Sequence, residues 1–103
     1  MREYHYLARV DDIPARQSRR FEIGGKEILV CHVKGEFFAL DNICTHAYAQ
    51  LNEGRLRGYR LICPLHGASF DVRDGSVKGK PALVPLKSYS LKIEDGEISV
   101  RLE

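Results

Sequence analysis

Residues 89–102 read YSLKIEDGEISVRL, and this stretch is the clearest structural signal in the chain. Apolar and polar side chains alternate on both sides of the pair Asp95-Gly96, and a period of two is typical of a half-buried β-strand. Asp-Gly is also the pair that a type I′ turn between antiparallel strands favours. The stretch therefore predicts a hairpin whose inward side chains are Leu91, Ile93, Ile98, Val100 and Leu102.

The same signals predict two further strand pairs upstream. Residues 21–23 and 26–33 are rich in apolar and β-branched side chains, and Gly24-Gly25 separates them as a hairpin turn would. The pair Lys34-Gly35 then turns the chain into residues 36–40.

Helical signals are nearly absent. No window of about 12 residues keeps helical apolar spacing without a Gly or Pro, and residues 11–14 predict a single helical turn. We expect an all-β fold, an antiparallel β-sandwich or partly open barrel of about eight to ten short strands. Residues 1–103 would form one domain, with a small loop-rich subdomain inserted at about residues 41–71.

The composition excludes several classes of protein. The 103 residues include 16 Lys and Arg and 14 Asp and Glu, and the net charge of +2 is too small to indicate nucleic acid or a membrane surface. The apolar runs are far shorter than the ~20 residues that a membrane helix needs. We find no signal-peptide pattern and an odd number of cysteines, so we expect reduced thiols and a cytoplasmic location. A net charge of +2 on a small domain is compatible with a monomer, which we expect here.

Two short motifs carry the chemistry. Cys44-Thr45-His46 is a Cys-x-His box, Cys63-Pro64-Leu65-His66 is a Cys-x-x-His box, and 16 residues separate them. Two loops brought together would offer two sulfurs and two nitrogens, a ligand set that suits zinc or iron–sulfur clusters and not calcium or magnesium. The spacing favours iron–sulfur over a structural zinc site, whose ligands are usually paired as Cys-x₂₋₄-Cys and His-x₃₋₅-His. A catalytic Cys–His pair would leave the second box unexplained.

These motifs resemble the Rieske iron–sulfur proteins, whose pattern is Cys-x-His followed by Cys-x-x-His-Gly. The resemblance continues through residues 69–71, the turn Asp74-Gly75, the loop 79–82 and the strand 86–89. It implies one 2Fe-2S cluster, with one iron held by the two cysteines and the outer iron by the two histidines. The implied ligands are Cys44, His46, Cys63 and His66.

The resemblance also implies a low reduction potential. Respiratory Rieske proteins carry an extra cysteine in each box and two hydroxyl side chains near the cluster sulfurs. The corresponding residues here are Ala49, Leu65, Ala68 and Phe70. We therefore expect a potential near the low end of the Rieske range, roughly −150 mV.

The chain length and the later landmarks look most like the small Rieske ferredoxins of bacterial aromatic-ring-hydroxylating dioxygenases. This implies a soluble one-electron carrier, not itself an enzyme, between an NADH-dependent flavoprotein reductase and a terminal oxygenase. The alternatives are the small Rieske subunit of an assimilatory nitrite reductase and a zinc-stabilised binding module.

Several other residues receive specific interpretations. The resemblance places Tyr48, Leu65 and Pro81 in three loops around the cluster, as an apolar docking face. A second set is expected to be structural, namely Cys31 as a buried apolar residue, His5 and His32 as structural or surface residues, and Tyr59 and Phe70 as packing residues. A third set, Arg55, Arg57 and Arg60, is either a solvated face or a steering patch for an acidic partner.

Overall fold

The computed structural model describes residues 3–45, 48–65, 67–80, 82 and 84–102. Ten strands and two single-turn 3₁₀ helices are seen among these residues, which confirms the all-β class. The strands of the larger sheet are β1 (His5–Arg9), β2 (Ser18–Ile23), β3 (Lys26–Val33), β4 (Glu36–Asp41), β9 (Ser88–Glu94) and β10 (Glu97–Arg101). The smaller elements are η1 (Val10–Asp12), η2 (Leu51–Glu53), β5 (Arg55–Arg57), β6 (Arg60–Ile62), β7 (Ser69–Asp71) and β8 (Val77–Gly79).

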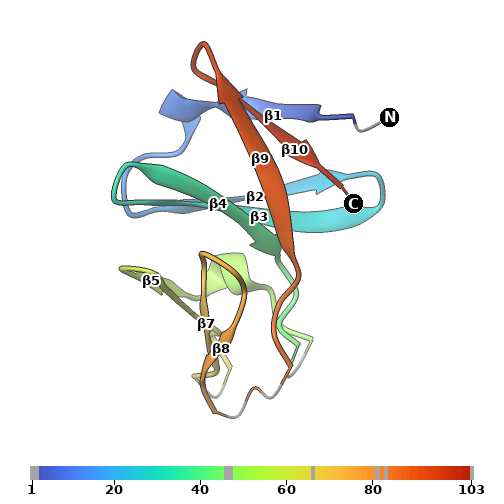
Figure 1. The fold of residues 1–103 in the computed structure, drawn as a ribbon. Coiled ribbons are helices and arrows are strands. Elements are labelled where there is room, and N and C mark those ends of the chain that lie inside the picture. The colour runs from blue at the N-terminus through green and yellow to red at the C-terminus, as the bar shows by residue number, and fades with distance from the viewer. Residues whose placement is uncertain (1–2, 46–47, 66, 81, 83, 103) are drawn as a thin grey trace.

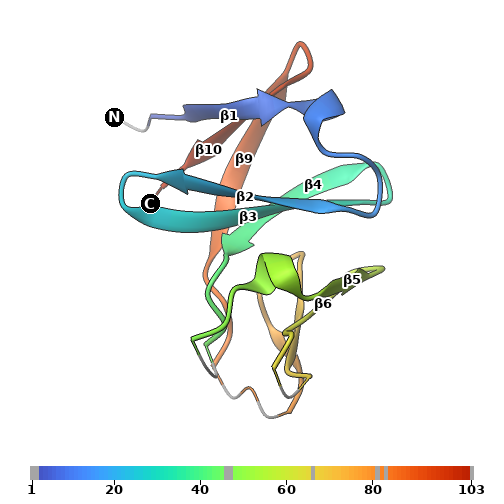
Figure 2. The ribbon, with the colours of Figure 1, turned by 180° about the vertical axis from the view of Figure 1, so that it is seen from behind.

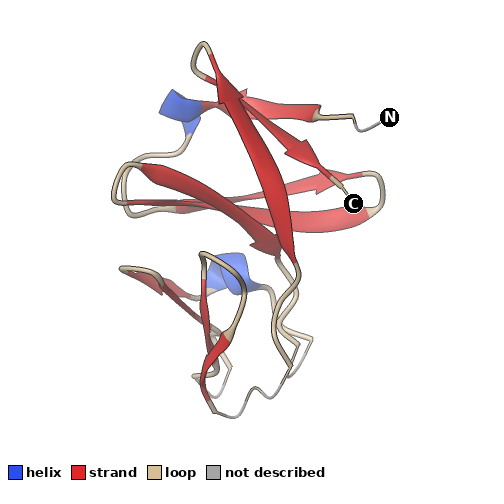
Figure 3. Cartoon of the chain, in the orientation of Figure 1, coloured by secondary structure: helices blue, strands red, loops and turns tan. Residues whose placement is uncertain are grey.

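The strands form two antiparallel sheets. The six-stranded sheet has the order β1-β10-β9-β4-β3-β2 and curls into an open barrel, and the four-stranded sheet has the order β5-β6-β7-β8 (Figure 1). The small sheet lies at one end of the barrel, and the chain crosses to it after β4 and returns before β9 (Figures 1 and 2). Strands dominate the barrel, whereas loops dominate the small lobe formed by residues 42–87 (Figure 3).

The predicted hairpins are confirmed. Asp95 and Gly96 both have positive φ, at 52° and 77°, as a type I′ turn requires. Ile98 and Val100 are fully buried, and Leu91 and Leu102 are partly buried against the same core. Ile93 points to the same face as buried Ile98, as predicted, but its side chain is 43% exposed. It pairs with Ile98 one residue from the turn, where the core no longer covers it.

Alternate residues of β3 face two different cores. Leu29, Cys31 and Val33 pack toward the small lobe, whereas Ile28 and Val30 pack into the barrel. Because both faces of this strand are covered, the run ILVC at residues 28–31 is apolar throughout instead of alternating. The lobe core comprises Leu29, Cys31, Val33, Leu40, Cys44, Ala49, Leu51, Leu61, Cys63, Ala68, Phe70, Val72, Ala82 and Leu86. The barrel core comprises Ile13, Ile28, Val30, Ala39, Tyr89, Ile98 and Val100.

The segment between Asp41 and Phe70 is more regular than its sequence predicts. It contains η2, β5, β6 and the beginning of β7, and β8 extends the same sheet to Gly79. Each strand of this sheet has three residues, which is too short for alternation to show. Within the described ranges, no helix is long and apolar enough to cross a membrane.

Candidate metal centre

Two buried cysteines meet at the end of the small lobe. Cys44 follows β4 and is 4% exposed, and Cys63 follows β6 and is 2% exposed. The two thiols are near enough for Cys44 to affect the pKa of Cys63. Burial raises the pKa of the Cys63 thiol, the neighbouring Cys44 adds to this, and a hydrogen bond from the backbone of Leu65 opposes it. The fold therefore brings together two soft ligands that lie 19 positions apart in the chain.

The two cysteine loops are built in the same way. The backbone N–H of Cys44 donates to the carbonyl of Ala49 at 2.9 Å, and the N–H of Cys63 donates to the carbonyl of Ala68 at 2.7 Å. Each loop is thus closed by a hydrogen bond from its cysteine to the residue five positions later. The matched motifs in the sequence correspond to matched loops in the structure.

The histidines of the two motifs, His46 and His66, lie outside the described residues. In sequence each falls between the cysteine and the residue that closes its loop, 44–49 for the first and 63–68 for the second. Their part in the site stays a prediction.

A third segment is attached to the first loop. The hydroxyl of Thr45 donates to the carbonyl of Val84 at 2.5 Å, which joins the Cys44 loop to the connection between β8 and β9. Ala82 of this connection is buried in the lobe core. Three segments far apart in sequence therefore gather at the end of the molecule that lies farthest from the barrel (Figures 1 and 2).

An asparagine pair that the sequence analysis missed supports the first loop. Asn42 is fully buried, donates to the Oδ1 of Asn52 at 2.8 Å, and accepts from the backbone N–H of Asn52 at 2.9 Å. The carbonyl of Asn42 also accepts from the N–H of Leu51 at 2.7 Å. These bonds fix η2 against the end of β4, directly before Cys44. The only sign of this pair in the sequence is that Asn42, a polar residue, lies between an apolar strand and the motif that begins at Cys44.

The surface around the loops is apolar and open to solvent. Tyr48 is 96% exposed, Leu65 46% and Val84 59%. This confirms the exposure expected of Tyr48 and Leu65 and adds Val84, which the sequence analysis missed. Pro81 lies outside the described residues.

The other interpreted residues are packing residues or surface residues. Cys31 is fully buried in the lobe core, as expected, and so is Phe70. The Nδ1 atom of His32 lies 2.7 Å from the carbonyl oxygen of Ile13, and its ring stacks on that of Phe37 with 4.2 Å between the ring centres. These contacts confirm a structural role for His32. Tyr59 packs against Phe38, and His5 is half-buried on β1.

The donor set fits a metal group held by thiolates. Two thiols lie side by side in an apolar core, and the described residues that enclose them include Ala49, Leu51 and Ala68. Such a site suits thiophilic metals such as iron or zinc, whereas calcium and magnesium require oxygen ligands.

Comparison with known proteins decides the family. A family model described as the Rieske [2Fe-2S] domain matches residues 3–90. The chain belongs to this family. The Rieske match implies one 2Fe-2S cluster.

Among the Rieske relatives is the ferredoxin component of the naphthalene 1,2-dioxygenase/salicylate 5-hydroxylase systems of Ralstonia sp. It is 44% identical over 66 residues, which are 64% of this chain and 64% of the relative. The ferredoxin component of biphenyl 2,3-dioxygenase of Rhodococcus jostii (strain RHA1) is 47% identical over 64 residues, 62% of this chain and 60% of the relative. The chain thus covers less than two thirds of the length of these curated relatives.

Solved Rieske structures match nearly the whole chain. A chain in the complex of reduced oxygenase and oxidized ferredoxin in carbazole 1,9a-dioxygenase has a TM-score of 0.92 and 32% identity, over 97% of this chain and 94% of that chain. A putative NADH-dependent nitrite reductase small subunit from Mycobacterium tuberculosis has a TM-score of 0.87 over 100% of this chain and 97% of that chain. Its identity is 16%, so this likeness concerns the fold alone.

Proposed function

We propose that this chain is a one-electron carrier, a ferredoxin that passes electrons from an NADH-dependent flavoprotein reductase to a terminal aromatic-ring-hydroxylating oxygenase. The observation that carries the proposal is the pair of matched loops that brings the thiols of Cys44 and Cys63 together inside a Rieske domain. The relatives include ferredoxin components of naphthalene and biphenyl dioxygenases, which supports an aromatic-ring-hydroxylating oxygenase as the electron acceptor.

In this proposal four side chains hold the cluster, Cys44 and Cys63 on the inner iron and His46 and His66 on the outer iron. When bound, a 2Fe-2S cluster accepts and releases one electron. Two thiolates and two neutral imidazoles leave the oxidised centre with no net charge, so an added electron is less costly than on a centre with four thiolates. The protein contributes the two closed loops that fix the cysteines, and a core that excludes water from them.

The exposed rim of Tyr48, Leu65 and Val84 is the proposed docking face for both redox partners. Small apolar contacts suit short-lived redox encounters, which bury less than about 1,200 Å². In this proposal the carrier is a monomer that presents the rim to one partner at a time.

The proposed potential is low, roughly −150 mV. Ala68 and Phe70 are fully buried next to the Cys63 loop, and neither can donate a hydrogen bond from its side chain. Ala49 and Leu65 stand where a bracing disulfide would require cysteines. A low potential suits acceptance of electrons from a reduced flavin.

The two alternatives have less support. The nitrite reductase subunit resembles this chain in fold alone, whereas the dioxygenase ferredoxins resemble it in sequence. The zinc module is opposed by the family match.

A dye-mediated redox titration of the purified holoprotein, with electron paramagnetic resonance of the reduced end point, tests the proposal. We expect a rhombic spectrum with an average g value below about 2 and a potential of roughly −150 mV. A potential well above 0 mV would indicate a quinol-linked partner and rule out the proposed position between reductase and oxygenase. A colourless protein containing stoichiometric zinc would end the electron-transfer proposal.

A further inference from the structure

A basic recess lies on the outer face of the small sheet. It has a volume of about 320 Å³, and its lining residues are Arg57, Tyr59, Arg60, Asp71, Arg73 and Lys78. Four of these side chains are cationic and one is anionic, so the recess carries a net charge of +3 on a chain whose total is +2. This recess is called the basic recess below.

Two of its arginines face each other across the sheet. Arg57 on β5 is the register partner of Arg60 on β6, and both side chains are exposed. Like charges placed directly opposite each other on neighbouring strands destabilise a sheet. In the described part of the chain, no carboxylate lies within 4.0 Å of either guanidinium group. Among the described residues, this like-charge pair is therefore not neutralised by an ion pair.

The one carboxylate of the basic recess is already engaged. Asp71 is the register partner of Arg60, but both of its oxygens accept from Arg73, at 3.0 Å from Nε and at 2.7 Å from Nη2. This contact holds the pKa of Asp71 below its ordinary value. Because Arg73 occupies the carboxylate, Arg57 and Arg60 remain free to bind an anionic group from outside.

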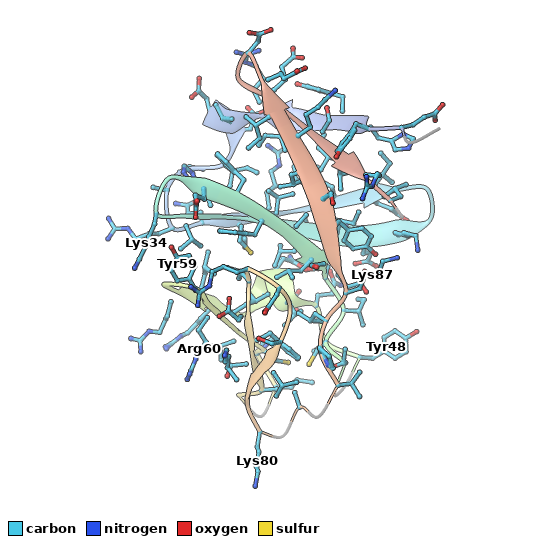
Figure 4. The ribbon with its side chains drawn as sticks, in the orientation of Figure 1. Lys34, Tyr48, Tyr59, Arg60, Lys80 and Lys87 are labelled. Carbon is cyan, nitrogen blue, oxygen red and sulfur yellow. The ribbon has the colours of Figure 1, made fainter. Side chains whose placement is uncertain are left out.

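The aromatic ring of Tyr59, which lines the recess, contacts two cations. The guanidinium carbon of Arg73 lies 4.0 Å from the ring centre of Tyr59, and the ammonium of Lys34 lies 4.9 Å from the same centre. Lys34 comes from the turn after β3, so the barrel adds a further positive charge beside the recess (Figure 4). Cation–π contacts restrict these side chains without neutralising them.

The structure separates Arg55 from this group. Arg55 lines a different depression, of about 340 Å³, together with Glu53 and Cys63. The three arginines that cluster in the sequence therefore do not form one site.

We infer that the basic recess binds an acidic surface segment of a redox partner, and this inference rests on the proposed function. Arg60 begins β6, and the same strand ends at Ile62, directly before Cys63, so the recess lies on the element that carries the metal centre. Three residues of extended strand span about 10 Å. An acidic segment bound in the recess would thus lie about one strand length from the Cys63 loop. Tyr59 and Arg60 lie on the opposite side of the lobe from Tyr48, so the recess and the apolar rim are separate contacts (Figure 4).

The test is a titration of ¹⁵N-labelled oxidised holoprotein with a hexaglutamate peptide. NMR measures the amide chemical shifts at each peptide concentration. We expect the shifts to centre on residues 57–60 and 71–78 and to weaken as salt is added. The double variant Arg57→Gln/Arg60→Gln should bind the peptide about fivefold more weakly. The control Arg16→Gln/Arg19→Gln removes the same charge from the barrel and should bind like the wild type. Equal losses in the two double variants would overturn the inference, because binding would then follow net charge alone.

Two further measurements complete the test. Unfolding in urea should show Arg57→Gln/Arg60→Gln to be at least as stable as the wild type, since the substitution removes a like-charge pair. A less stable variant would mean that the arginines serve the fold, and would contradict the inference. Inorganic phosphate at the same ionic strength should shift the same amides less than the peptide does. A larger effect of phosphate would make the recess a small-anion site instead. A failed redox titration would remove the proposed function without altering any of these binding results.

Discussion

At the residue scale, the side chain at position 68 is expected to affect the reduction potential. Its carbonyl accepts the hydrogen bond that closes the Cys63 loop, and its methyl group is fully buried in the lobe core. A serine at this position would place a hydroxyl donor beside a cysteine ligand. Hydrogen bonds to cluster or ligand sulfur stabilise the reduced, more negative state and raise the potential.

The substitution Ala68→Ser should therefore raise the reduction potential. A hydrogen bond that strengthens by about 1 kcal/mol on reduction raises a one-electron potential by about 40 mV. Protein-film voltammetry of the holoprotein measures this change. Ala39→Ser is the matched control, because Ala39 is equally buried but belongs to the barrel core, and its potential should equal that of the wild type. An unchanged potential in Ala68→Ser would show that this position does not reach the sulfurs.

Cys31 is a buried cysteine outside the two cysteine motifs. Burial raises the pKa of its thiol from 9.0 to about 12, so the folded protein holds this thiol neutral. Below about pH 8.5 the thiol is protonated in both states and has no effect on the pH dependence of stability. Above that pH the Cys31 thiol ionises in the unfolded chain but not in the folded protein. The free energy of unfolding therefore falls as the pH rises toward 12.

We therefore expect Cys31 to resist iodoacetamide at pH 8 and at pH 10 in the folded holoprotein and to react readily in urea. Peptide mass spectrometry measures the labelled fraction. Stoichiometric labelling of the folded protein at pH 8 would show that the thiol is accessible, against the burial seen in the structure.

At the element scale, two turns with the same backbone conformation have different surroundings. Gly25 and Gly75 have φ of 78° and 81°. A Cβ atom on Gly25 would meet nothing within 4 Å, whereas one on Gly75 would lie 2.1 Å from the carbonyl oxygen of Leu86. Gly75 also donates to the carbonyl of Asp71 at 2.7 Å and accepts from the N–H of Leu86 at 2.8 Å. The turn after β7 therefore anchors the segment that returns to β9.

Gly25→Ala and Gly75→Ala separate the backbone effect from the steric effect. Gly25→Ala should cost about 1 kcal/mol of unfolding free energy, because only the strained φ opposes it. Gly75→Ala should cost roughly 3 kcal/mol, because the Leu86 hydrogen bond must also shift or break. Thermal unfolding of both holoproteins provides the comparison. Equal losses would show that the return segment adapts to the added methyl group without cost.

At the scale of the whole molecule, β3 divides the protein into two cores. One face of this strand packs in the lobe core, which includes Cys44 and Cys63, and the other packs in the barrel core, which contains neither. The strands of the small sheet have three residues each, so the ladder within the lobe is short. The metal centre is thus expected to stabilise the lobe more than the barrel.

Removal of the cluster should therefore loosen the lobe selectively. In the variant Cys44→Ser/Cys63→Ser we expect amide hydrogen exchange to accelerate at least about tenfold across residues 42–87, while β1, β9 and β10 keep their protection. Cys31→Ala, which removes a lobe cysteine outside the two proposed ligand motifs, should retain the cluster and the slow exchange of the loops. Uniform loss of protection in the double serine variant would mean that the two cores unfold as one unit.

The sequence by itself determined the features that depend on local signals. Residues 89–102 contain both the alternation and the Asp95-Gly96 turn that make a hairpin, so no distant contact was needed to predict it. The two Cys and His motifs likewise occur within four residues each, and their resemblance to the Rieske pattern was confirmed by the family match.

Only the tertiary structure decided the features that leave no regular pattern in the sequence. The three-residue strands of the small sheet leave no period in the sequence, and the buried link between Asn42 and Asn52 depends on a turn between them. Arg55, Arg57 and Arg60 look equivalent in the sequence, yet strand register places Arg57 opposite Arg60 and leaves Arg55 beside the cysteine loop. The turn at Gly58 and Tyr59 sets the register that pairs Arg57 with Arg60, and strands of three residues are too short for their pattern to predict it.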